Sequence, residues 1–247
     1  YEALGRKPPE ELFIAVRPPA APQGTPGRIR PRLDGRVDPP EEWKGAAYLP
    51  DLEGTAMQTQ DDLLRGVYLG FDEQNVYLRV DLREGMRATD RLHVYATTPG
   101  EEGGAAFPEG SRASLGFPLQ QRITLDLDQV RDGEAVLVRY AYRDGAWVLA
   151  TSPADLRGRR AYVGEVVEMR LPYTTLKAGP GDTLRLAVVL ERQGRVVDAA
   201  PDAHPLALSL PQRLAGKEVL AIPDPEGDEH GPGTYTYPKD NAFAPFQ

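Results

Sequence analysis

Alternating apolar and polar positions predict a β-hairpin between Arg65 and Arg83. Val67, Leu69 and Phe71 share one face of the first arm, and the second arm has its own apolar face, made of Val76, Leu78, Val80 and Leu82. A period of two is typical of half-buried antiparallel strands, and the polar segment 72–75 supplies the turn. Because an isolated hairpin is barely stable in water, its apolar face needs a partner sheet.

Other segments of the chain alternate in the same way. A second hairpin is predicted over residues 134–150, where Asp144-Gly145 is a two-residue turn signal that places Tyr142 opposite Trp147 and Tyr140 opposite Leu149. The remaining predicted strands cover residues 30–35, 91–96, 122–128, 165–171, 183–191 and 206–210. We expect the strands that follow Glu134 and Glu165 to pack against the first hairpin.

These patterns predict an all-β fold, an antiparallel β-sandwich of immunoglobulin or jelly-roll type with about ten strands and irregular N- and C-terminal extensions. Proline and glycine set the domain boundaries. Residues 1–28 are interpreted as the tail of a preceding domain plus a proline-rich linker, 29–222 as the sandwich, and 223–247 as an acidic linker and the start of a following module. The loop 99–110 has no apolar pattern, and a loop of this length is either functional or mobile.

The composition of the chain limits the classes of partner that it can have. The 247 residues are 40% hydrophobic without a long apolar run, which suits one substantial core and predicts no membrane span. A net charge of -8 argues against nucleic acid or an anionic membrane as the main partner. The chain has no cysteine, so it forms no disulfide. Arginine greatly outnumbers lysine, which is consistent with a GC-rich, thermophilic source.

No catalytic constellation stands out. The three histidines, His93, His204 and His230, are scattered without zinc-ligand spacing. The acidic series Asp224-x-Glu226-x-Asp228 places alternate oxygen donors on a glycine-containing loop, a pattern that Ca²⁺ accepts. A solvated acidic linker explains the same residues, so calcium is one of two interpretations.

Aromatic side chains are the candidates for carbohydrate binding, because their rings stack on the apolar faces of sugars. Tyr68 and Tyr77 lie on the non-core face of the first hairpin, where they meet either a sugar, a loop or a neighbouring domain. Trp43 sits on a short turn after Pro39-Pro40 and is either core or a ligand platform. Trp147 shares a face with Tyr140, Tyr142 and aliphatic residues, which favours the core, with a sugar platform as the alternative.

Three segments resemble known families. Residues 33–43 (LDGRVDPPEEW) and 66–79 (GVYLGFDEQNVYLR) resemble the opening of DOMON-like modules related to family 9 carbohydrate-binding modules. Residues 224–238 (DPEGDEHGPGTYTYP) are similar to the start of the glucodextranase C-terminal type module. The N-terminal residues 1–9 (YEALGRKPP) resemble the tail of a family 57 glycoside hydrolase catalytic domain of the amylopullulanase type. The middle of the chain carries no matching motif.

The resemblance implies a non-catalytic module of an enzyme that degrades α-glucans such as starch or pullulan. Its partners would be the polysaccharide and a catalytic domain of the same polypeptide, and its location extracellular or at the cell surface. The resemblance does not fix a sugar-binding residue on this chain. The alternative is a structural domain that packs on or links catalytic domains without binding sugar.

Overall fold

The computed structural model describes residues 23–37, 41–50, 63–111, 114–150, 160–201 and 205–210, and the two short strands 220–221 and 234–235. The chain divides into two compact units, 1–210 and 211–247. In the described residues the first unit is built from antiparallel strands, which confirms the all-β prediction. No helix in this part of the chain is long and apolar enough to cross a membrane.

The strands of the first unit are β1 (Ala47–Pro50), β2 (Leu64–Phe71), β3 (Asn75–Leu82), β4 (Asp90–Ala96), β5 (Gln121–Arg131), β6 (Glu134–Arg143), β7 (Ala146–Leu149), β8 (Arg160–Val163), β9 (Val166–Pro172), β10 (Thr183–Arg192), β11 (Arg195–Ala200) and β12 (Leu206–Ser209). Their hydrogen-bonded order is β1-β2-β3-β9-β8-β6-β5-β4-β10-β11, with β7 beside β6 and β12 beside β10.

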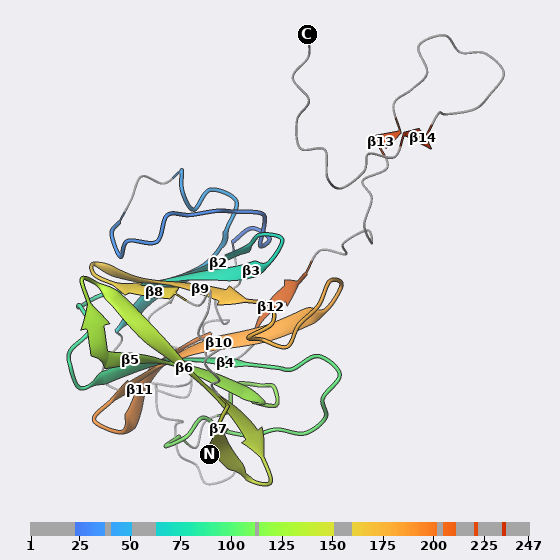
Figure 1. Cartoon of the computed structure of the whole chain (residues 1–247). Helices are drawn as coiled ribbons and strands as arrows, with labels where there is room; N and C mark the ends of the chain where they lie inside the picture. Colours follow the sequence, from blue (N-terminus) through green and yellow to red (C-terminus); the bar gives the residue numbers. More distant parts are fainter. Residues whose placement is uncertain are drawn as a thin grey trace, which may run out of the picture. The chain divides into compact units, whose positions relative to one another are not determined.

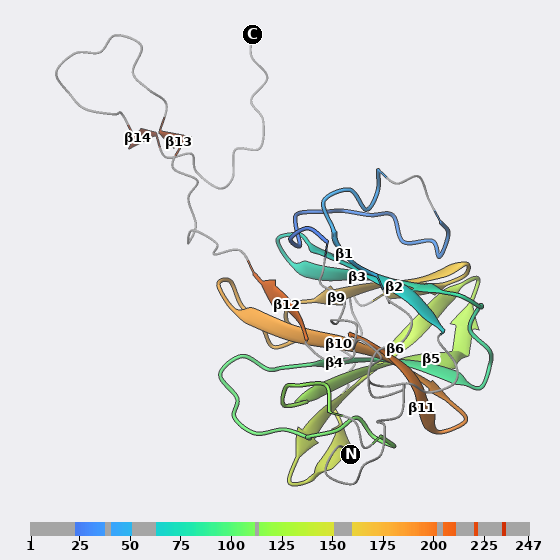
Figure 2. The same cartoon turned by 180° about the vertical axis from the view of Figure 1, so that it is seen from behind.

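This one sheet folds over on itself into a two-layered sandwich (Figures 1 and 2). We call β1, β2, β3, β9 and β8 the upper layer, and the other seven strands the lower layer. The layers join where β8 pairs with the first two residues of β6. At the opposite end, Asp198 of β11 accepts hydrogen bonds of 2.7 Å from the backbone N–H groups of Leu63 and Leu64, so the sheet is nearly closed.

The first hairpin forms as predicted. Val67 pairs with Val80 and Leu69 with Leu78, and all four side chains are buried between the layers. The Asp72 carboxylate accepts the backbone N–H groups of Gln74 and Asn75, at 2.7 Å each, which fixes the turn. The hairpin packs against apolar residues of the lower layer, which include Leu92, Val94, Ile123, Leu125, Leu137 and Val188.

Of the two strands expected to pack against the first hairpin, one does so. The strand after Glu134 is β6, in the lower layer, and its Leu137 joins the core under the hairpin. The strand after Glu165 is β9, which pairs edge to edge with β3 in the same layer instead of packing on it. Alternation reports that one face is buried, but it does not distinguish a neighbouring strand from a facing one.

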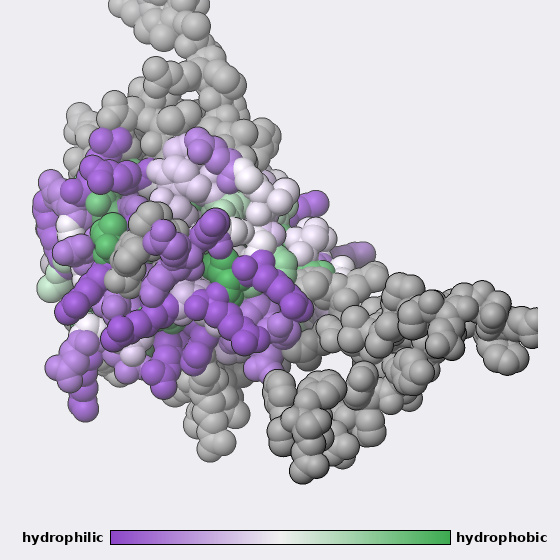
Figure 3. All heavy atoms as spheres, turned by 90° about the horizontal axis from the view of Figure 1, so that it is seen from above, coloured by the Kyte–Doolittle hydropathy of each residue, from purple (hydrophilic) through white to green (hydrophobic). Residues whose placement is uncertain are grey.

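The prediction of a strand over residues 30–35 is wrong. This segment has no strand ladder and lies over the outer face of the upper layer, where Ile29 packs with Trp43 and Tyr77. Pro31 has no N–H to give to a ladder, and the N–H groups of Asp34 and Gly35 go to the carboxylate of Glu168 at 2.8 and 2.9 Å. Seen from above, the face that includes this segment is largely hydrophilic (Figure 3).

The second unit contributes one described feature. β13 (Leu220–Ala221) pairs antiparallel with β14 (Thr234–Tyr235), so that Leu220 lies opposite Tyr235.

Candidate functional site

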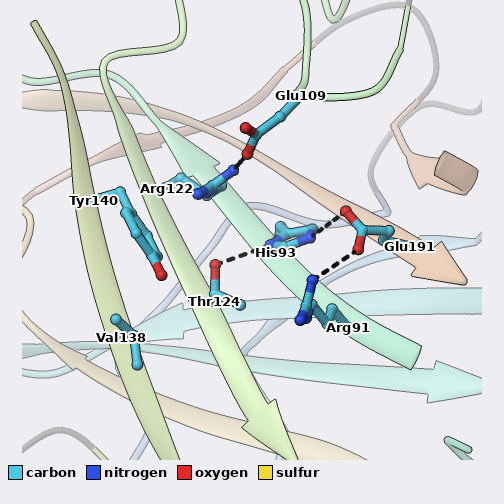
Figure 4. A pocket seen from close by; sticks show the side chains of 8 residues that line it. All are labelled: Arg91, His93, Glu109, Arg122, Thr124, Val138, Tyr140 and Glu191. Atoms are coloured by element: carbon cyan, nitrogen blue, oxygen red, sulfur yellow. Dashed lines mark hydrogen bonds and ion pairs between the residues drawn. The ribbon is translucent and has the colours of Figure 1, made fainter. Parts of the chain in front are cut away.

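A polar pocket of about 250 Å³ opens on the outer face of the lower layer (Figure 4). Its walls come from β4, β5, β6 and β10 and from the loop that joins β4 to β5. The lining residues are Arg91, His93, Glu109, Arg122, Thr124, Val138, Tyr140 and Glu191. Ligand pockets usually measure roughly 300–1,000 Å³, so this one suits a small group such as a single sugar ring.

The pleat of the strands places these residues. On β4, Leu92 and Val94 point into the core, so that Arg91 and His93 point outward. The sheet register then sets Thr124 of β5 beside His93, and Glu191 of β10 beside Arg91. Four polar side chains from three strands thus meet on one outer surface.

His93 is buried at the floor of the pocket and has a partner on each ring nitrogen. Its Nδ1 lies 2.9 Å from the Thr124 hydroxyl and its Nε2 lies 3.3 Å from a Glu191 carboxylate oxygen. A neutral ring satisfies both contacts if Nε2–H donates to Glu191 and Nδ1 accepts from Thr124. Burial lowers the pKa of His93, and the hydrogen bond from His93 lowers the pKa of Glu191. His93 is therefore neutral and Glu191 ionised at neutral pH.

Arg122 forms the opposite wall. Its guanidinium lies 4.3 Å from the centre of the Tyr140 ring and 5.2 Å from that of Trp147, which gives two cation–π contacts. One terminal nitrogen pairs with Glu109. Its Nε is buried and has no hydrogen-bond partner among the described residues. A buried polar atom without a hydrogen-bond partner is unusual in a folded protein.

The loop between β4 and β5 brings Glu109 to the pocket. Ala105 and Leu119 form a bridge across the base of this loop, and both pack on Tyr95 in a second apolar cluster outside the sandwich core. The backbone N–H of Glu109 donates to the Tyr95 hydroxyl at 3.2 Å. The loop 99–110 thus contributes Glu109 to the lining of the pocket.

The charges of the pocket balance. Arg91 and Arg122 carry one positive charge each, Glu109 and Glu191 one negative charge each, and the ring of His93 is neutral. Arg91 donates to Glu191 at 3.3 Å, so each arginine has its own carboxylate partner. A pocket with many hydrogen-bonding groups and no net charge fits a neutral polyhydroxylated ligand better than an ion.

The second hairpin forms as predicted, but its aromatic face is not the sandwich core. Tyr142 pairs with Trp147 across the turn, and the rings meet edge to face with centroids 5.3 Å apart. Ala135 and Leu137 of β6 point into the core instead, and Tyr142 and Trp147 pack in the second cluster on the outer face. Apolar residues occupy both faces of β6, so alternation alone does not say which face points inward.

The other aromatic candidates lie on the upper layer. Trp43 and Tyr77 are buried in one cluster with Ile29, and Tyr68 is partly buried against it. The Trp43 ring nitrogen donates to Glu168 at 3.0 Å, and the Tyr77 hydroxyl donates to Asp72 at 2.8 Å. Burial and this hydrogen bond raise the pKa of Tyr77 to about 12. Tyr77 is thus covered by the segments that carry Ile29 and Trp43, which corresponds to the alternative in which a loop covers it. Sugar binding by Trp43, Tyr68 and Tyr77 stays a prediction.

The predicted calcium ligands Asp224, Glu226 and Asp228 lie outside the described residues.

The pocket residues Arg91, Arg122, Tyr140 and Glu191 all fall in predicted strands, but the sequence analysis did not group them into one site. The signal that joins them is the strand order β6-β5-β4-β10, which alternation does not contain.

Comparison with known proteins gives one family match. Residues 219–247 match the family described as the C-terminal binding module, SLH-like, of glucodextranase. No curated protein matches the chain. The matched segment agrees with the resemblance of residues 224–238, and it supports an accessory, carbohydrate-binding module as the class of protein.

Proposed function

We propose that this chain is a non-catalytic module that binds α-glucan for a glycoside hydrolase of the amylopullulanase type. The observation that carries the proposal is the charge-balanced pocket on the outer face of the lower layer, beside Tyr140 and Trp147. Its charge-balanced hydrogen-bonding groups suit sugar hydroxyls, and the Tyr140 ring lines the same cavity.

The finer parts of the proposal rest on resemblance. The DOMON-like segments and the N-terminal resemblance to family 57 enzymes favour α-glucan and a tethered catalytic domain, and the match over residues 219–247 supports an accessory role. Such a module raises the effective concentration of its glucan near the active site without taking part in the chemistry. The match to an SLH-like binding module supports an extracellular or cell-surface location.

Affinity electrophoresis tests the proposal. We expect native gels that contain soluble starch or pullulan to retard the protein, and gels that contain no polysaccharide to leave its mobility unchanged. Unchanged mobility in every glucan tried would contradict α-glucan binding.

A second candidate function is structural. β7 is an edge strand whose Val148 and Leu149 are 48% and 60% exposed, and exposed apolar residues on a strand edge are typical of a contact with another domain. In this account the module packs on a catalytic domain and binds no sugar. Removal of the module would then lower the melting temperature of the whole enzyme, while the isolated module would ignore all glycans.

We also propose a calcium site at Asp224, Glu226 and Asp228, on the basis of their spacing alone. A ligand that binds only the folded state raises the melting temperature with its concentration. Millimolar Ca²⁺ should therefore stabilise the protein and a chelator should reverse the effect. A melting temperature indifferent to both would exclude the site.

A further inference from the structure

The two arginine–carboxylate pairs of the pocket lie on either side of His93. Along β4, Arg91 is two residues before His93, and Arg122 of β5 pairs with Tyr95, two residues after it. The pair Arg91–Glu191 therefore borders one end of the floor and the pair Arg122–Glu109 the other, as Figure 4 shows. His93 and the four residues of the two pairs line the same cavity.

Each pair presents a donor and an acceptor next to each other. An arginine N–H only donates and a carboxylate oxygen only accepts, whereas a hydroxyl group does both. Two neighbouring hydroxyls on a sugar ring match such a pair, because one accepts from the guanidinium while the other donates to the carboxylate. Hydrogen bonds to charged partners are also the strong ones.

The two pairs are held in different ways. Glu191 is fixed at the floor, because one oxygen contacts His93 and the other contacts Arg91. The side chain of Glu191 is only 12% exposed, whereas that of Glu109 is 59% exposed. Glu191 is thus a preorganised acceptor, and His93 and Thr124 act as positioning residues for it. Glu109 belongs to a loop and pairs with the Arg122 guanidinium, whose Nε has no hydrogen-bond partner among the described residues.

We infer that the pocket recognises the vicinal hydroxyl pair of a pyranose ring. Glu191 and Arg91 contact this pair from one end of the pocket floor, and Arg122 contacts it from the other end. The inference rests on the proposed function and specifies its chemistry. In an α-1,4-linked glucan, the free vicinal pair on an internal unit is formed by the 2- and 3-hydroxyls. The 6-hydroxyl is not part of that pair, so the pocket should tolerate changes there.

Isothermal titration with three ligands tests the inference. We expect the protein to bind short amylose and 6-O-methyl amylose with similar affinity, and to bind 2,3-di-O-methyl amylose at least about tenfold more weakly, since each lost hydrogen bond to a charged group weakens binding by about that factor or more. Equal binding of the 2,3-di-O-methyl derivative would overturn the inference and leave α-glucan binding intact. Failure to bind unmodified amylose would overturn both.

Substitutions locate the contacts. Glu191→Gln and Arg122→Lys should each weaken amylose binding at least about tenfold. The matched controls Glu84→Gln and Arg87→Lys change an exposed ion pair outside the pocket and should bind like the native protein. Because Arg122 is buried and its replacement can impair folding, Arg91→Gln provides a second test at a side chain that is 62% exposed. Native affinity in Arg91→Gln and Glu191→Gln would overturn the inference.

Tryptophan fluorescence gives an independent readout. The chain has two tryptophans, and Trp147 lies beside Arg122 whereas Trp43 is buried on the upper layer. Amylose should change the emission of the native protein, and Trp147→Phe should remove that change. A change that survives in Trp147→Phe would place the ligand elsewhere and contradict the inference.

Discussion

At the scale of single residues, Glu168 ties the N-terminal segment to the sandwich. Its carboxylate is fully buried and accepts hydrogen bonds from two backbone N–H groups, of Asp34 and Gly35, and from the ring of Trp43. Burial raises the pKa of Glu168 in spite of these donors. A carboxylate in this position depends on each of its partners, because a buried charge that loses one is poorly compensated.

Trp43→Phe tests this dependence. The substitution keeps most of the apolar ring and removes the N–H, so we expect the free energy of unfolding to fall by about 1.5–3 kcal/mol, the usual contribution of a hydrogen bond to a charged group. Urea denaturation measures the loss. Trp147→Phe, at a partly exposed ring, is the control and should lose less. Equal stability of native protein and Trp43→Phe would mean that this bond contributes nothing.

The buried histidine predicts a pH dependence. The pKa of His93 is lower in the folded protein than its unfolded value of about 6.5. The unfolded chain therefore takes up the proton first as the pH falls, and stability decreases between pH 6.5 and the lower folded pKa. Above pH 6.5 this contribution is fully present.

Unfolding measured from pH 7.5 down to pH 5 checks the prediction. His93→Gln removes the titrating ring and keeps a hydrogen-bonding side chain, so its stability should fall less steeply with decreasing pH than that of the native protein. The other two histidines remain in this variant and provide the background. Parallel curves for the two proteins would show that His93 is not linked to folding in this range.

At the scale of elements, the cover over the upper layer depends on glycines. A Cβ on Gly70 of β2 would lie 2.4 Å from the Ile29 side chain and 3.2 Å from the carbonyl oxygen of Gly27. Gly70→Ala would force the Ile29 side chain to move, and overpacking of this kind costs about 1–3 kcal/mol. Thermal unfolding should show a lower melting temperature. Gly85→Ala, where a Cβ meets nothing within 4 Å, is the matched control, and equal losses in the two variants would refute the close contact.

The sequence predicted the strands better than their arrangement. Both hairpins and most other strands follow from alternation and from the turns at 72–75 and 144–145. Alternation missed β1 and β8, which have only four residues each, and it missed β11, whose exposure does not alternate. Alternation also wrongly placed the aromatic face of β6 in the sandwich core, because both faces of that strand carry apolar residues. Which face is buried depends on strand order, and that is a property of long-range pairing.

The candidate site shows the same limit. Arg91 and Arg122 are far apart from Glu191 in the chain and meet only because β4 lies between β5 and β10. Polar residues on the outer face of a strand look alike in a sequence, whether they line a pocket or face solvent. The aromatic candidates were easier to find, since large rings are rare, but Trp43 and Tyr77 are used for packing.

At the scale of the whole molecule, the chain combines a sandwich with a second unit that begins after Leu210. The family match over residues 219–247 falls in the second unit, whereas the pocket belongs to the first. Glycan binding in the first unit is therefore an independent claim, which the match alone does not test. The substitutions that test it must be placed on the sandwich.

The most direct measurement is affinity electrophoresis of two tyrosine variants in gels containing soluble starch. Tyr140 stacks on Arg122 in the pocket, and Tyr68 stacks on Arg79 at 4.9 Å on the upper layer. If the pocket binds α-glucan, starch retards the native protein and Tyr68→Ala equally, whereas Tyr140→Ala migrates as it does without starch. Retardation of Tyr140→Ala to the native extent, or of none of the three proteins, would contradict the account.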